Sequence, residues 1–138
     1  MTGNLKRHEP APAAGPYSPA VRAGDWLVCS GQLGVRAVPG GVELVQGGLG
    51  PQARQALSNV AELLGAHGLD WSSVVKVTVF LASPGSADKG SVFAKFNEVY
   101  SDVLRSHRPA RSAVMVESLP LGALVEVEVW AYAGSGRG

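Results

Sequence analysis

The sequence predicts a single α+β domain in which two helices cover one face of a β-sheet. Two segments repeat apolar residues at three- and four-residue steps, which is typical of amphipathic helices. Two others alternate apolar and polar residues, which is typical of half-buried strands. At 138 residues the chain has the length of one domain with one core. The expected order of elements is ββ(β)αβαββ.

The N-terminal third predicts a hairpin and then glycine-rich connections. Residues 17–23 and the apolar run 26–31 flank a Gly24-Asp25 turn, the pattern of two antiparallel strands. The stretch 34–50 is rich in glycine and leaves room for only a brief strand at Val42, Leu44 and Val45.

Two segments predict the helices. Pro51 suits the first turn of a helix that is expected to end near Gly68. Its apolar face consists of Ala53, Ala56, Leu57, Val60, Leu63 and Leu64. The second helix follows a loop at 84–90, and Pro109 prevents any continuation. Its apolar face consists of Val92, Phe93, Phe96, Val99, Tyr100, Val103 and Leu104.

The remaining strands complete the sheet. Residues 74–81 are predicted to form a strand with two different faces. One face carries Val75, Val77, Val79 and Leu81, and the opposite face carries Lys76, Thr78 and Phe80. Residues 111–116 form a strand after Pro109. Residues 124–133 alternate so that one face carries Glu126, Glu128, Trp130 and Tyr132. A face that mixes aromatics with carboxylates is often covered by another subunit, so we expect a homo-oligomer.

Composition narrows the class of protein. Hydrophobic residues make up 46% and charged residues 17%, as in globular proteins. The net charge of +1 and the absence of a basic block argue against nucleic acid as a partner. Apolar runs are too short for a membrane span, and the N-terminus is too polar for a secretory signal. A single cysteine fits a cytoplasmic protein. The domain is expected at 1–133, with a loose arm at 1–14 and a flexible tail at 134–138.

Motif searches leave few residues for chemistry. The sequence contains no GxGxxG, P-loop or GxSxG motif. His8, His67 and His107 lie far apart and lack metal-ligand spacing, so they do not indicate a metal site. Cys29 lies in an apolar strand and is expected to be a small buried hydrophobe.

Arg111 and two glutamates remain as candidates. A guanidinium held on a strand among small residues can bind a carboxylate through two hydrogen bonds. A surface arginine or a structural ion pair is the simpler interpretation of Arg111 from pattern alone. Glu126 and Glu128 share one side of a strand, roughly 7 Å apart. One of them could act as a base or orient a water, although a polar strand face is the simpler interpretation.

Six short stretches in order carry a resemblance to a known family. They are Ala14-Gly15-Pro16-Tyr17-Ser18, Cys29-Ser30-Gly31-Gln32, Lys76-Val77-Thr78-Val79-Phe80-Leu81, Phe96-Asn97-Glu98-Val99-Tyr100, Pro109-Ala110-Arg111-Ser112 and Leu124-Val125-Glu126-Val127-Glu128. Together they resemble the Rid family of reactive enamine/imine deaminases, also called YjgF-like proteins, over about residues 10–133. The resemblance implies a chorismate-mutase-like fold and a homotrimer whose sheets line a central barrel, with sites in the clefts between subunits.

The resemblance also implies roles for individual residues. The arginine of the Pro-Ala-Arg-Ser stretch binds the substrate carboxylate in active members, which assigns that role to Arg111, aided by the main-chain amide of Ala113. Glu126 is implied to position a water. Further pocket-lining positions are matched by Tyr17, which would close the cleft, and by Ser30, Gly31 and Asn97.

The implied reaction is cofactor-free hydrolysis of 2-aminoacrylate or its imine tautomer to a 2-keto acid and ammonia. Such intermediates are released by pyridoxal-phosphate enzymes. Two alternatives remain open: a non-enzymatic protein that binds small carboxylates such as 2-keto acids, and a pathway-specific relative that acts on a larger imine. The loop at 84–90 is longer than usual in the family, which bears on substrate size. A ribonuclease role has been suggested for some relatives, but this sequence lacks the basic patch that binding to RNA would need.

Overall fold

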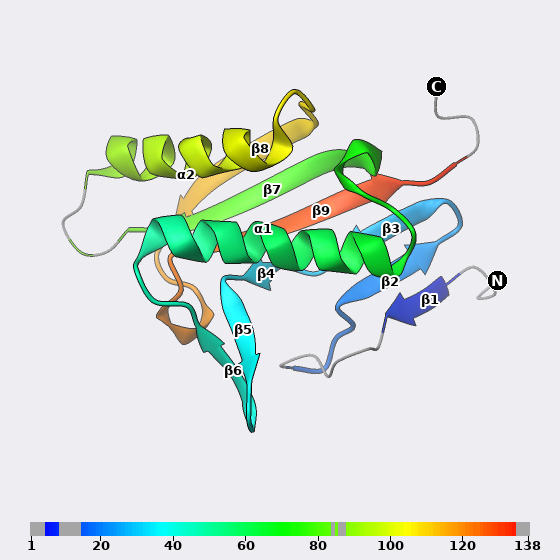
Figure 1. The fold of residues 1–138 in the computed structure, drawn as a ribbon, viewed down its shortest axis with the longest axis horizontal. Coiled ribbons are helices and arrows are strands. Elements are labelled where there is room, and N and C mark those ends of the chain that lie inside the picture. The colour runs from blue at the N-terminus through cyan, green and yellow to red at the C-terminus, as the bar shows by residue number, and fades with distance from the viewer. Residues whose placement is uncertain (1–4, 9–14, 84, 86–87, 135–138) are drawn as a thin grey trace.

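The computed structural model describes residues 5–8, 15–83, 85 and 88–134, which form a two-layer α+β fold (Figure 1). The helices are α1 (Leu49–Ala66) and α2 (Lys89–Leu104), with short 3₁₀ turns at Trp71–Ser73 and Pro120–Gly122. The strands are β1 (Leu5–His8), β2 (Ala20–Ala23), β3 (Trp26–Cys29), β4 (Gln32–Leu33), β5 (Val35–Val38), β6 (Gly41–Leu44), β7 (Val74–Ala82), β8 (Ala110–Val116) and β9 (Val125–Tyr132). Two helices against one sheet confirm the predicted architecture.

The main sheet is mixed. Its strands lie in the order β1-β2-β3-β9-β7-β8, and β4 also pairs with β9. Only β7 and β8 are parallel among the described pairs, and α2 connects them. A parallel pair needs a crossover of this kind. Figure 1 shows that the crossover puts α2 beside α1 on the same face of the sheet.

The core lies between the helices and this covered face. Every residue of the predicted apolar face of α1 is buried. In α2 most of the predicted face is buried, while Phe93 and Val103 are partly buried at its margin. The sheet contributes the fully buried side chains of Leu27, Val77, Val79, Leu81, Val125, Val127, Val129 and Ala131. Apolar residues that repeat about every 3.6 positions in the helices and every 2 positions in the strands therefore meet in one core, as predicted.

One prediction for β7 is wrong. Val75 was expected on the same buried side as Val77, but it is 43% exposed, whereas Val74 is buried. The pairing of β7 with β9 shifts register between Val74 and Lys76. A bulge of this kind inserts an extra residue and reverses the alternation that precedes it.

The structure adds three strands that the sequence does not predict, β1, β4 and β5. β1 lies within the segment expected to be a loose arm and pairs with β2, so that β1 forms one edge of the sheet. β5 pairs with β6 in a separate hairpin that projects beyond the sheet (Figure 1). The side chain of Asn59 holds the base of this hairpin by donating hydrogen bonds to the carbonyls of Leu33 (3.0 Å) and Val35 (2.9 Å).

Some predicted segments lie outside the described residues. These are the rest of the arm (1–4 and 9–14), positions 84, 86 and 87 of the predicted loop, and 135–138 of the tail. Within the described ranges, no helix is both long and apolar enough to span a bilayer.

Candidate functional site

Arg111 lies on the helix-covered face, at the outer edge of the sheet. The parallel register sets it beside Val77, whose side chain is buried beneath the helices. Its guanidinium carbon lies over the ring of Tyr100, 4.8 Å from the centroid, and 5.9 Å from that of Phe96. Arg111 is exposed.

No acidic side chain neutralises Arg111 within the described part of the chain. The ion pairs found there are Arg36 with Glu43 and Arg54 with Asp102, both at 2.7 Å. Of the two simpler interpretations, the structural ion pair therefore has no support among these residues, whereas the exposure of Arg111 agrees with a surface arginine. The guanidinium keeps its hydrogen-bond donors available for an anion.

Two further predicted residues lie on the same face as Arg111. Ala113 follows it on β8 in register with buried Val79, so its side chain also faces the helices. Asn97 follows Phe96 on α2, and its Oδ1 is buried without a hydrogen-bond partner among the described atoms. A buried acceptor of this kind is stabilised by any donor that a ligand or another subunit brings to it.

The other predicted residues gather around Glu126 on the opposite face. Glu126 pairs with Phe80 of β7 and Leu33 of β4, and its side chain points away from the helices. Gly31 lies directly against it: a Cβ at this glycine would be 2.5 Å from Glu126 Oε2. Gly31 is therefore the residue whose lack of a side chain makes room for the carboxylate.

Ser30 connects this group to the loop that carries Tyr17. The Ser30 hydroxyl donates to the carbonyl of Ser18 at 2.6 Å, and its amide donates to that of Pro19 at 2.8 Å. Tyr17, one residue before Ser18, is 52% exposed. Tyr17 thus presents its ring to solvent, while hydrogen bonds from Ser30, just after β3, hold the backbone of the residues that follow it.

The electrostatics of Glu126 differ from those of a free glutamate. Burial, and secondarily the negative charge of Glu128, raises the pKa of the Glu126 carboxyl. Both effects disfavour the charged form. The resulting carboxylate is a stronger base than one in water.

One copy of the chain does not bring the two groups of residues together. Arg111, Ala113 and Asn97 lie on the helix-covered face, whereas Glu126 lies on the open face with Gly31 and Ser30 beside it. The sheet itself separates them. The sequence could not reveal this, because alternation within a strand does not say which face a neighbouring strand will share.

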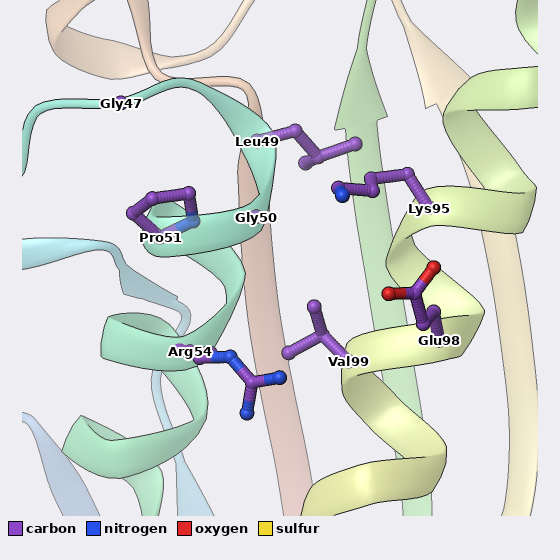
Figure 2. Close-up of a pocket in the computed structure, with 8 residues that line it drawn as sticks. All are labelled: Gly47, Leu49, Gly50, Pro51, Arg54, Lys95, Glu98 and Val99. Atoms are coloured by element: carbon purple, nitrogen blue, oxygen red, sulfur yellow. The ribbon is translucent and has the colours of Figure 1, made fainter.

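A cavity of about 570 Å³ lies elsewhere, between the N-terminal part of α1 and α2 (Figure 2). It is lined by Gly47, Leu49, Gly50, Pro51, Arg54, Lys95, Glu98 and Val99. None of the predicted site residues is among them. Arg54 pairs with Asp102 of α2. This cavity is thus separate from the predicted residues.

The remaining candidates have structural roles. Burial raises the pKa of the Cys29 thiol to about 12, so this cysteine is a buried hydrophobe, as predicted. The Nε2 atom of His107 lies 3.0 Å from the carbonyl oxygen of Val74. Over the described ranges no three His, Cys, Asp or Glu residues gather as metal ligands would.

The helical repeat predicts Tyr100 only as part of the α2 core. The structure places it beneath Arg111 as well. Its position in the helical repeat is the same as that of an ordinary core residue, so periodicity alone carries no signal for the second role.

These features define a class of protein: a small two-layer α+β domain with an exposed arginine at the sheet edge that has no acidic partner among the described residues. Comparison with known proteins then identifies its family. The family model described as Endoribonuclease L-PSP matches residues 7–133. Curated relatives named 2-iminobutanoate/2-iminopropanoate deaminase include the protein of Bos taurus, 44% identical over 90% of this chain and 85% of its own length. The human one is 42% identical over 88% and 83%.

Solved structures agree with these relatives. RidA from an Antarctic Psychrobacter is 37% identical, with a TM-score of 0.77 over 94% of this chain and 98% of that one. E. coli TdcF, solved with bound serine, is 33% identical, with a TM-score of 0.76 over 88% and 91%. The chain therefore belongs to the L-PSP family that includes the Rid proteins, which confirms the resemblance predicted from its motifs.

Proposed function

We propose that this chain is a hydrolytic deaminase of small 2-imino and 2-enamino acids, working without a cofactor at a site shared by two copies of the chain. The observation that carries the proposal is the exposed Arg111, which has no acidic partner in the described part of the chain and lies on the face opposite to a half-buried Glu126. The deaminase names of relatives at 42% and 44% identity supply the reaction class.

The open sheet face supports an assembly. It exposes Trp130, which is 46% accessible and packs edge-on against Trp26 at 6.0 Å between ring centroids. Covering such a face removes apolar surface from water. The family resemblance implies a homotrimer with a central barrel. In that assembly Glu126, Gly31 and Ser30 of one protomer face Arg111, Ala113 and Asn97 of the next.

Substrate binding begins with the carboxylate. The Arg111 guanidinium donates two hydrogen bonds to the two carboxylate oxygens, and the amide of Ala113 donates a third. β8 is an edge strand, so alternate N–H groups along it are not used by the sheet. Tyr17 of the other protomer closes the cleft, which excludes bulk water and strengthens these contacts.

The chemistry then needs one oriented water. The oxygen of that water adds to the electrophilic carbon of the protonated imine while Glu126 accepts a proton from it, giving a carbinolamine. The proton passes from Glu126 to the amine nitrogen, the C–N bond breaks, and its electron pair leaves with ammonia. The hydroxyl proton is lost as the carbonyl of the 2-keto acid forms. The raised pKa of Glu126 suits its use as the base.

The first test traps imines with semicarbazide while an amino acid oxidase generates them from several amino acids. The protein is expected to lower semicarbazone formation, and Arg111→Ala is expected to abolish this effect while remaining folded. Full activity of Arg111→Ala would refute the assignment. Binding of 2-ketobutyrate without any turnover would instead favour the carboxylate-binding protein, and suppression only with bulky amino acids would favour a larger imine.

A second test addresses the shared site. Arg111→Ala and Glu126→Gln are each expected to be inactive alone. Refolded together in equal amounts, they are expected to regain about a quarter of wild-type activity, because a quarter of the interfaces in a cyclic assembly then pair an intact arginine with an intact glutamate. No recovery in mixed oligomers would refute a site built from two protomers.

A further inference from the structure

We infer that Tyr100 is a positioning residue whose ring holds the Arg111 guanidinium in place to receive the substrate carboxylate. The inference rests on the proposed role of Arg111. It concerns an aromatic residue of α2 that no predicted site includes, and it explains how an exposed arginine can present its donors in one direction.

The geometry of the contact carries the inference. The guanidinium carbon of Arg111 lies over the Tyr100 ring at 4.8 Å from its centroid, within the range of a cation–π interaction. The Phe96 ring lies 5.9 Å from the same carbon. The two rings are 5.6 Å apart and inclined by 36°. Arg111 therefore rests on a surface made of two aromatic side chains from one helix.

The two rings of this surface are held rigidly, whereas the side chain of Arg111 is exposed. Tyr100 is only 6% exposed and Phe96 is fully buried, so both rings are fixed by the core. A free arginine side chain has rotamer entropy to lose on binding. Contact with a fixed ring removes part of that freedom before the ligand arrives, and so lowers the cost of binding.

An aromatic support is also compatible with the ligand. A carboxylate from the protein would use the same N–H donors that the substrate needs, whereas a cation–π contact uses none of them. The absence of an ion pair to Arg111 among the described residues fits this arrangement. The positive charge is held in place without being neutralised.

The hydroxyl of Tyr100 has no part in the contact. Its oxygen is buried and has no hydrogen-bond partner among the described atoms. The ring alone therefore carries the role, and Tyr100→Phe is expected to preserve it. Tyr100→Leu removes the π face while leaving an apolar side chain in the core.

The test measures the dissociation constant for 2-ketobutyrate by calorimetry on the full-length oligomer. Tyr100→Leu is expected to weaken binding about fivefold, and Tyr100→Phe to restore wild-type affinity. Val99→Ala is the packing control, because it opens a cavity in the same helix away from Arg111; it is expected to lower thermal stability and leave the dissociation constant unchanged. In turnover, Tyr100→Leu is expected to raise KM more than it lowers kcat.

The outcomes separate this inference from the proposed function. If Arg111→Ala binds as tightly as the wild type, the proposed site itself fails. If Arg111→Ala loses binding but Tyr100→Leu keeps the wild-type affinity, only the aromatic support is refuted. Equal weakening by Val99→Ala and Tyr100→Leu would also refute it, since loss of packing would then suffice.

A spectroscopic measurement covers the case in which Tyr100→Leu does not fold. Protons held over an aromatic ring resonate upfield, so the Arg111 Nε–H signal, assigned by its loss in Arg111→Ala, is expected upfield of the other arginine signals in the wild-type protein. An Arg111 signal at the position typical of a solvated arginine would overturn the inference.

Discussion

Replacing Gly31 by alanine tests the arrangement around Glu126 most directly. A Cβ at this position would lie 2.5 Å from Glu126 Oε2, 2.7 Å from its Cδ and 2.9 Å from its Cγ. The backbone of Gly31 is not in the left-handed region, so alanine introduces no backbone strain there. The only consequence is steric, and it falls on the proposed water-positioning carboxylate.

The magnitude follows from the distances. Ordinary contacts begin at 3.4 Å, so the carboxylate must move by about 0.9 Å, the difference between 3.4 and 2.5 Å. A displacement of about 1 Å in a catalytic group can lower a rate about 100-fold. We therefore expect Gly31→Ala to reduce kcat/KM about 100-fold, equivalent to about 2.7 kcal/mol of transition-state stabilisation.

Gly34→Ala is the matched control. There a Cβ would lie 2.4 Å from the backbone oxygen of Gln52, within α1, and a backbone cannot yield as a side chain can. We expect Gly34→Ala to cost about 1–3 kcal/mol of unfolding free energy, and Gly31→Ala to cost less. Imine trapping measures kcat/KM, and urea unfolding measures the unfolding free energy. A Gly31→Ala enzyme with wild-type kcat/KM would refute the reasoning.

Two further predictions concern pH and stability. Glu128→Gln removes the like charge that raises the pKa of Glu126, so the acid limb of the kcat/KM profile is expected to move to lower pH; a limb that stays in place or moves to higher pH would contradict the proposed base. Gln52→Ala removes a buried acceptor that receives the Leu124 amide at 2.9 Å. It is expected to lower the unfolding free energy by about 1–3 kcal/mol in urea titrations at fixed protein concentration, and unchanged stability would count against this buried hydrogen bond.

Much of the fold could be predicted from periodicity. The inward faces of α1 and β9 were readable because burial repeats with the geometry of the element itself, every 3.6 or 2 residues. Val75 shows where this reasoning stops. The bulge beside it depends on how β7 pairs with β9, a strand far away in the chain.

The strands β1 and β5 show a second limit. Their pairing rests on backbone hydrogen bonds to neighbours, and for β5 also on the Asn59 side chain at the base of the hairpin. Backbone donors and acceptors are the same for every residue other than proline. No apolar pattern in the sequence therefore predicts these strands.

Periodicity and short motifs were enough to predict the two helices, the alternating strands, the family and the residue types available for binding a carboxylate. The positions of those residues relative to one another depend on the folded chain. Alternation orders side chains within one strand, but the face shared between strands depends on register, here Val77 beside Arg111 and Phe80 beside Glu126. That long-range pairing sets Arg111 over the Tyr100 ring and Glu126 on the opposite face of the sheet.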